Sequence, residues 1–310
     1  MAFEAALPLT SIIPYFIGFA VLLIGSYTDF KTREVPDWVN FGLIGIGFGV
    51  NLLFSIVYWK INFILASAIG FGIFFAIAWL MFYLGQWGGG DSKMLMGLGA
   101  LFGIDIFSKS FVGLSIMQFL SVILQLFLVV FLINALLVGA LYGILWSTVL
   151  ILKNRRKYIK SFKRSLKNKK VTLTKKIILA LFIILILFSA VIPDNLIRLM
   201  LLYLAIVIAL TFYLWIAVKA VESSCMLKYV KPQQLTEGDW IAKDVKVDGK
   251  YVTGPKDLGI EKKKIRKLIE LYKKGKVKKI LIKEGIPFVP SFFVAYVITL
   301  AYGNLILSVI

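Results

Sequence analysis

Long runs of apolar residues without a single charge dominate the chain and limit what it can fold into. Residues 5–28 and 61–90 contain no Asp, Glu, Lys or Arg, and 60% of the 310 residues are hydrophobic. A soluble domain of this composition would lack the polar residues to cover its surface, whereas uncharged runs of ~18 residues or more can cross a bilayer as helices. The sequence therefore predicts an all-α polytopic membrane protein.

About eight transmembrane helices are expected. They are predicted near residues 11–28, 39–58, 61–86, 92–107, 126–152, 177–192, 196–218 and 288–309. Residues 111–152 are one uncharged tract, too long for one crossing and short for two, so we interpret 108–125 as an interfacial or buried segment. The amino-terminal run lacks the basic start and early cleavage site of a removable signal peptide, and we expect it to remain as the first span.

One polar stretch, residues 220–287, has the pattern of a small α+β domain. Short alternating runs around turn residues predict strands, and LGIEKKKIRKLIELYKKG predicts a basic helix from about 260 to 274 that ends at Gly275, before a last strand. Its acids stand among many cations, and we interpret them as ordinary surface charge. The expected organisation is a membrane catalytic core at 1–152, a basic cytoplasmic loop at 153–176, a transmembrane hairpin at 177–219, the cytoplasmic α+β domain at 220–287 and a C-terminal transmembrane helix at 288–310.

Positive charge is concentrated on one side of this layout. Of the 36 Lys and Arg residues, 33 fall in the segments that alternating spans place on the same side: two in 31–38, one in 87–93, 12 in 153–176 and 18 in 219–287. The positive-inside rule makes that side cytoplasmic and places the C-terminus outside the cell membrane. Topology and contact with anionic lipid headgroups thus explain the net charge of +20, and no nucleic-acid-binding module is recognisable.

Two aspartates stand where an uncharged run ends, an unfavourable place for a charge that has no function. Asp29 follows residues 5–28, and Asp91 follows 61–90 within WGGGDSKMLMGLGALFG. The predicted topology puts both at the cytoplasmic boundary. Two carboxyl groups brought together there can act as an aspartyl protease, because one accepts a proton from water while the other, protonated, polarises the scissile carbonyl.

The residue inventory excludes several other kinds of catalytic site. The chain contains no His and one Cys, Cys225, which rules out His-based triads, His metal sites and paired-Cys zinc or redox sites. Neither a metal nor a cofactor is expected, and carboxylates remain as the chemical groups.

The glycines around Asp91 indicate close approach of backbones. Gly88, Gly89 and Gly90 would let an extended peptide substrate approach, or would let the loop itself adopt positive φ. A flexible turn between spans is the alternative. The glycines of GLGALFG at 97–103 have the spacing that allows close helix packing, which we expect to bring spans one and four together.

Three stretches resemble one family of membrane proteases. GGGDSK matches the GxGD motif through Gly88, Gly90 and Asp91, TDFKTREVPDW resembles the first aspartate motif of type IV prepilin and preflagellin (archaellin) peptidases, and IPFVPSFFVAYVITLAYGN resembles their last span. The resemblance implies a GxGD aspartic endopeptidase that removes the short basic leader of type IV pilin-like or archaellin precursors, with Asp29 and Asp91 as the catalytic pair. Bacterial members that also methylate carry a cysteine-bearing domain between their first spans, and this chain has only 31–38 there. We therefore expect the archaeal branch, without methyl transfer.

A basic leader needs acidic contacts on so basic a face. Glu34 and Asp37, close in sequence to Asp29, are the candidate leader contacts, each worth up to about 1 kcal/mol. The alternative is that they balance neighbouring cations. Lys93 is a further candidate for the border of the cleft, with lipid headgroups as its alternative partner.

The ends of the predicted helices suggest different roles for the two aspartates. Asp91 begins a span, where unpaired N–H groups and the positive end of the helix dipole favour a carboxylate, whereas Asp29 ends one. We therefore expect Asp91 to be the ionised base and Asp29 its protonated partner.

Two other classes of function fit a chain of this composition. A proton-coupled membrane transporter could use the same acids, and a non-catalytic membrane scaffold could present the 220–287 domain to partners. A transporter would be expected to show internal repeats and acids nearer mid-span, and we find no convincing repeat.

Overall fold

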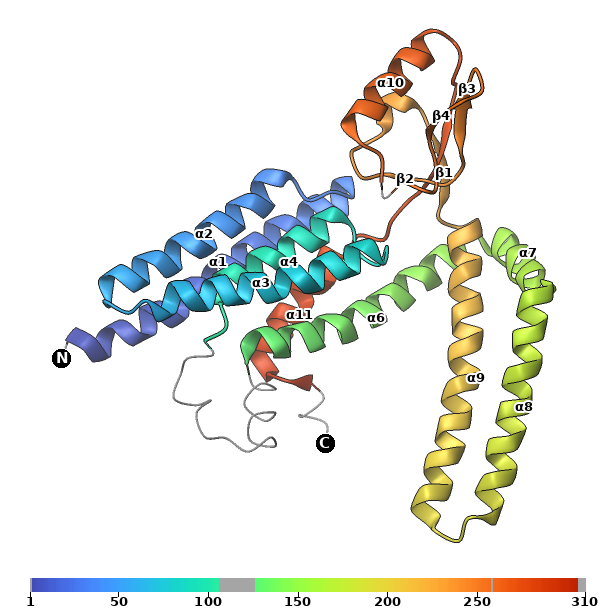
Figure 1. Ribbon diagram of the computed structural model, residues 1–310, viewed down its shortest axis with the longest axis horizontal. Coiled ribbons are helices and arrows are strands. Elements are labelled where there is room, and N and C mark those ends of the chain that lie inside the picture. Colours follow the sequence, from blue (N-terminus) through green and yellow to red (C-terminus); the bar gives the residue numbers. More distant parts are fainter. Residues whose placement is uncertain (1, 106–125, 258, 306–310) are drawn as a thin grey trace. The chain divides into compact units, whose positions relative to one another are not determined.

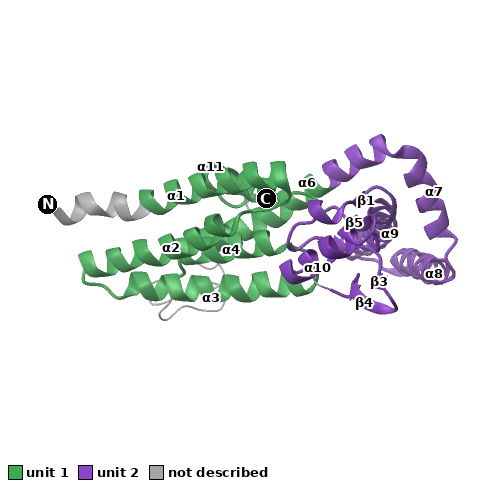
Figure 2. Ribbon diagram, turned by 90° about the horizontal axis from the view of Figure 1, so that it is seen from above, with its two compact units in different colours: residues 1–143, 285–310 green, residues 144–284 purple. Residues whose placement is uncertain are grey.

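The protein is mostly helical and spans the membrane several times. The computed structural model describes residues 2–105, 126–257 and 259–305. It separates into two compact units, residues 1–143 with 285–310 and residues 144–284 (Figure 1, Figure 2). Six helices of the described chain are long and apolar enough to cross a membrane: Ile12–Thr32, Asp37–Val57, Asn62–Tyr83, Phe127–Lys153, Lys169–Val191 and Asn195–Ser224.

The first unit is a bundle of helices. These are α1 (Ala2–Thr32), α2 (Asp37–Val57), α3 (Asn62–Tyr83), α4 (Gly89–Phe102), α6 (Phe127–Lys153, as far as residue 143) and α11 (Val289–Tyr302). The predicted spans 92–107 and 288–309 fall on α4 and α11, which have 14 residues each. Such a helix is about 21 Å long, less than the ~30 Å of the hydrocarbon layer. The total of eight spans therefore stays a prediction, and the predicted segment 108–125 lies outside the described residues.

Helix α4 packs closely against α2 and α3 through glycines. A Cβ atom on Gly47 of α2 would lie 2.7 Å from the backbone N of Leu101, and one on Gly99 would lie 2.6 Å from the carbonyl oxygen of Gly70 in α3. The buried Asn51 side chain strengthens the first contact, because its Nδ2 donates to the Leu101 carbonyl at 3.0 Å. Close backbone approach of this kind is typical of helices in membranes.

The prediction that the glycines at 97–103 bring spans one and four together was wrong about the partner helix. Gly99 and Gly103 approach the backbone of α3, and Gly97 meets Leu43 of α2. The reason is that α3 presents small residues such as Gly70 and Ala66 to α4, so the two backbones can approach closely. Helix α1 meets α4 through side chains instead, such as that of Met94.

Replacing Gly99 with Ala is expected to destabilise the first unit by about 1–3 kcal/mol, as overpacking of a tight core does. The new Cβ would lie 2.6 Å from the Gly70 oxygen and 2.7 Å from Phe74 Cβ, and neither belongs to the flexible end of a side chain. Thermal unfolding of the detergent-solubilised protein measures the loss. Gly45→Ala on α2 is the control, because nothing lies within 4 Å of its added Cβ; equal melting temperatures for the two variants would contradict the packing described.

The second unit combines three helices with a small α+β part. Its elements are α7 (Arg155–Leu166), α8 (Lys169–Val191), α9 (Asn195–Ser224), β1 (Leu227–Val230), η2 (Pro232–Gln234), β2 (Trp240–Ile241), β3 (Val245–Val247), β4 (Lys250–Thr253), α10 (Lys262–Lys273) and β5 (Ile280–Lys283). The strands form an antiparallel sheet in the order β1-β5-β2 and a separate β3-β4 pair. A core that includes Ile241, Leu268 and Ile280 joins α10 to the sheet.

Helix α7 lies within the segment 153–176 that the sequence predicted as a loop. Tyr158, Phe162 and Leu166 recur at the helical spacing i, i+4, i+8 and give this strongly basic segment an apolar stripe. Charge density concealed the pattern, because six of the other nine residues of the helix are basic.

Candidate active site

Asp29 lies in the last turn of α1 and is buried, with 5% of its surface exposed. Its Oδ2 accepts a hydrogen bond of 3.0 Å from the backbone N–H of Val289, the first residue of α11. Helices α1 and α11 are held together further along by the Tyr296 hydroxyl, which donates to the Tyr15 carbonyl at 2.6 Å. Asp29 thus satisfies one of the free N–H groups at the start of α11.

Asp91 lies in the first turn of α4. Its Oδ2 accepts a hydrogen bond of 2.9 Å from the backbone N–H of Gly88, the residue that precedes the helix. The chain reaches this point through Gly85, whose φ of 67° ends α3 with a left-handed turn that glycine adopts without strain. Each aspartate therefore has one oxygen oriented by a backbone donor at the beginning of a helix.

Trp87 holds the two backbone donors near each other. This buried residue immediately precedes Gly88, and its ring packs against that of Phe288, with 6.0 Å between centroids. Phe288 immediately precedes Val289, so one aromatic contact joins the donor of Asp91 to the donor of Asp29. Trp87 also meets Phe292 edge-on at 5.4 Å, which fixes the ring on the first turn of α11.

Another contact brings together the turns of α1 and α4 next to the two aspartates. A Cβ on Gly25, one turn before Asp29, would lie 2.6 Å from Met94 Cε, one turn after Asp91. The structure thus assembles the pair that the sequence singled out, from α1 and α4.

The structure removes the reason for expecting Asp91 to be the base and Asp29 its protonated partner. The sequence placed Asp29 at the unfavourable end of its own helix, but the fold also places it at the N-terminus of α11, where Val289 donates to it. Both carboxylates then receive a helix N-terminal N–H. Helix ends alone no longer decide which of the two is the base.

The glycine loop before Asp91 does not have the positive φ that was one of its expected uses. Gly88 is extended, with φ −72° and ψ 167°, while Gly89 and Gly90 form the first turn of α4. None of the three is among the described residues with positive φ. A Cβ on Gly90 would lie 3.4 Å from Val35 in the α1–α2 connection, so this glycine allows that connection to pack on the start of α4. A Cβ on Gly89 would meet only Phe82, at 3.9 Å.

Two of the charged candidates for the border of the cleft, Lys93 and Asp37, form an ion pair with each other. Lys93 Nζ forms an ion pair with Asp37 Oδ1 at 2.6 Å and lies 5.0 Å from the centroid of the Phe41 ring. Asp37 is exposed at the start of α2, and Glu34 is half-buried in the preceding connection. The structure therefore brings Lys93 to Asp37, which the sequence treated as separate candidates.

Sequence reasoning missed the contact of Val289 with Asp29 and the place of Tyr142, and it did not show that Trp87 is buried. Tyr142 lies on α6, which packs against the start of α11. A Cβ on Gly139, one turn earlier in α6, would lie 2.5 Å from the Phe288 ring. Pro at the second position of α11 was the one sequence signal, because Pro in a first turn marks where a helix begins and its N–H groups are free.

The acidic residues of the site do not form a metal centre. Within the described ranges, no three His, Cys, Asp or Glu side chains gather as a metal ion would require. Acid–base chemistry by the Asp29 and Asp91 carboxyl groups is what this arrangement can perform.

Comparison with known proteins identifies the segment that carries both aspartates. Residues 16–144 match the model of the type IV leader peptidase family. The chain is 38% identical over 89 residues to a preflagellin peptidase of Methanocaldococcus jannaschii, 43% over 89 residues to one of Methanococcus voltae, and 40% over 91 residues to one of Methanococcus maripaludis. Each alignment covers 29% of this chain and 38% of the relative's length.

Proposed function

We propose that this chain, whose residues 16–144 match the model of the type IV leader peptidase family, is a membrane aspartic endopeptidase of the GxGD type that removes leader peptides. The observation that carries the proposal is the meeting of Asp29 and Asp91, each oriented by a backbone donor and joined through the Trp87–Phe288 contact. The family match gives no support to the transporter or scaffold alternatives.

The reaction needs both carboxyl groups in opposite protonation states. The ionised aspartate accepts a proton from water while the water oxygen bonds to the scissile carbonyl carbon, and the protonated aspartate transfers its proton to the carbonyl oxygen. The resulting diol collapses as the peptide C–N bond breaks: the aspartate that took the water proton gives it to the leaving nitrogen, and the other aspartate takes a proton from a diol hydroxyl. The carboxylate and the acid are then restored. The hydrogen bonds from Val289 and Gly88 orient one oxygen of each group for these steps.

The proposed substrates are precursors of pilin-like or archaellin type, with a short basic leader before a hydrophobic segment. The names of the three relatives support this class. The distribution of Lys and Arg supports an active site at the cytoplasmic face and an outside C-terminus. The division into core, basic segment, hairpin, α+β domain and last helix at the predicted boundaries is part of the same proposal.

Product sequencing tests the proposed function. Purified full-length protein in detergent is incubated with an archaellin or pilin-like precursor, and the N-terminus of the product is sequenced. The expected product begins at the junction between the leader and the hydrophobic segment. If a folded preparation cleaves none of several such precursors, the proposal is wrong.

Removing Lys93 is expected to improve cleavage of basic leaders. Asp37 already binds Lys93, so a leader cation has to displace that ammonium group. Lys93→Gln should lower KM by up to about five-fold, the factor that corresponds to one exposed ion pair. Asp37→Asn should raise KM by a similar factor. Both effects are measured against a control precursor whose leader Lys and Arg are replaced by Gln, and equal changes with the two precursors would refute the contact.

A further inference from the structure

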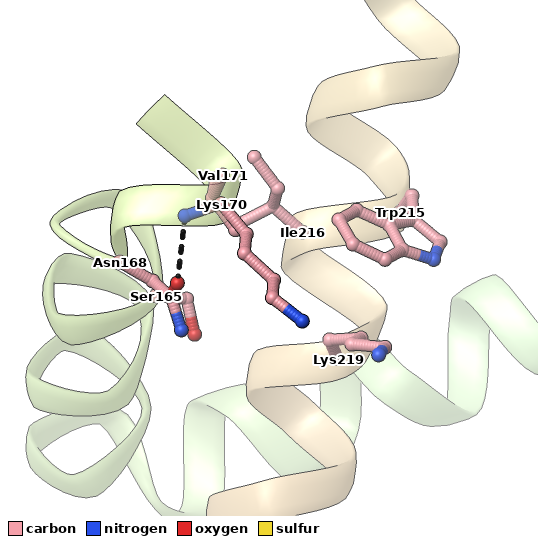
Figure 3. Close-up of a pocket in the computed structure, with 7 residues that line it drawn as sticks. All are labelled: Ser165, Asn168, Lys170, Val171, Trp215, Ile216 and Lys219. Atoms are coloured by element: carbon pink, nitrogen blue, oxygen red, sulfur yellow. Dashed lines mark hydrogen bonds between the residues drawn. The ribbon is translucent and has the colours of Figure 1, made fainter. Parts of the chain in front are cut away.

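A pocket in the second unit lies outside everything used for peptide cleavage. It has a volume of 220 Å³ and is bounded by the connection between α7 and α8 on one side and by α9 on the other (Figure 3). Its lining consists of Ser165, Asn168, Lys170, Val171, Trp215, Ile216 and Lys219.

Two ammonium groups give this pocket its charge. Figure 3 shows the side chain of Lys170 extending from α8 toward α9, and that of Lys219 lying along α9 on the side of Trp215, at the edge of the pocket. Among the described residues, no ion pair joins either of them to an acid. The adjoining segment 153–176 contains 12 Lys and Arg and no acid at all. An anion in the pocket would therefore relieve strong repulsion between like charges.

The residues around the pocket have the pattern of a membrane interface. The apolar run of α8 begins at Ile177, seven residues after Lys170 in the sequence, which is about 10 Å along a helix. Trp215 is exposed on α9, and Lys219 Nζ lies 4.9 Å from the centroid of its ring. Exposed Trp beside Lys at the end of an apolar helix is typical of the membrane interface.

The helices below the pocket are suited to contact with lipid. In the most apolar stretch of α8 no residue is buried within the protein, and in that of α9 only 17% of the residues are buried. Helix α7 is basic and has one apolar stripe. A 2.8 Å hydrogen bond between the hydroxyls of Ser161 and Ser223 joins it to α9. Such basic helices bind anionic membrane surfaces.

We propose that this pocket binds the phosphate group of an anionic phospholipid, held between Lys170 and Lys219. The ammonium groups contact the phosphate oxygens, and the exposed face of Trp215 covers the glycerol and the first part of the acyl chains. The lipid fixes the α8–α9 hairpin at its basic end. A phosphate ion could offer the same charge, but the apolar lining by Val171, Ile216 and Trp215 favours a lipid.

Native mass spectrometry of the full chain in detergent tests the site, with phosphatidylglycerol as the probe. One phosphatidylglycerol is expected to bind more tightly than the rest. The double variant Lys170→Gln, Lys219→Gln should weaken that binding by at least about 10-fold. The control is Lys163→Gln, Lys167→Gln, which removes the same amount of charge from the adjoining basic segment outside the pocket and should change binding by less than about two-fold.

Further measurements separate the sources of phosphate and guard against misfolding. Lys170→Arg, Lys219→Arg should restore binding, and the gel-filtration profile of each variant shows whether it is folded. Phosphatidylcholine should not compete, and inorganic phosphate should compete weakly. Equal losses in the two Gln double variants would overturn the proposal. Equal binding of phosphatidylcholine would do the same, as would occupation of the site by inorganic phosphate in preference to lipid.

Discussion

Asn in place of either Asp29 or Asp91 is expected to reduce the rate of leader cleavage by about 100- to 10,000-fold, the range that one general acid or base supplies. The side-chain oxygen of Asn can still accept the hydrogen bond from Val289 or from Gly88, so the fold around the site is kept. What disappears is the ability to take or give a proton. The initial rate of product formation from an archaellin-type precursor measures the effect.

Asp194→Asn is the matched control for these two variants. Asp194 also accepts a backbone N–H, from Ile197 at 2.9 Å, as the cap of α9. Because Asn caps helices about as well as Asp, this variant should cleave at the unchanged rate. A rate within about ten-fold of the original for Asp29→Asn or Asp91→Asn would mean that the residue is not one of the catalytic pair.

Trp87→Ala is expected to cost about 3–5 kcal/mol of stability, as truncation of a buried Trp does, and to impair cleavage as well. The indole ring packs on Phe288 and Phe292, and these contacts join the backbone donors of Asp29 and Asp91. Without the ring, the start of α11 and the loop before α4 can separate, so the carboxyl groups lose their common orientation. Melting temperature and the cleavage rate well below it measure the two effects separately.

Two further Trp variants distinguish positioning from general destabilisation. Trp59→Ala removes a ring that is 93% exposed and should change neither stability nor rate. Trp87→Phe keeps an aromatic contact with Phe288 and should recover much of the activity. If Trp87→Ala melts at a lower temperature yet cleaves at the original rate in the cold, Trp87 stabilises the bundle without positioning the aspartates.

Much of the membrane architecture could be predicted from local patterns. Uncharged runs located all six of the long apolar helices, because exclusion of charge from hydrocarbon is a property of each segment alone. The same reasoning could not predict the length of the helix that carries Asp91. Helix α4 ends at Phe102, where Gly103 has a φ of 62°, and the predicted span ran on to residue 107.

Interactions between distant segments were beyond sequence reasoning. Lys93 and Asp37 are 56 residues apart, and nothing local indicates that they form an ion pair. The glycines at 97–103 showed that some backbone approaches α4, but their spacing could not identify which helix does so. The identity of the partner helices depends on Gly47 and Gly70. Nothing in the sequence distinguishes these two from glycines that have no atom within 4 Å of an added Cβ.

The sequence by itself determined that Asp29 and Asp91 are exceptional, because a carboxylate at the edge of hydrocarbon is unfavourable wherever the rest of the chain lies. Only the tertiary structure decided what each carboxyl group meets. The donor to Asp91 is three residues away and follows from its place in a helix, whereas the donor to Asp29 is 260 residues away, at the start of α11. Helix ends are properties of the local chain, but the N–H groups they leave free can be satisfied by any carboxylate that packing brings near. The electrostatic balance between the two aspartates is therefore set by how α11 packs against α1.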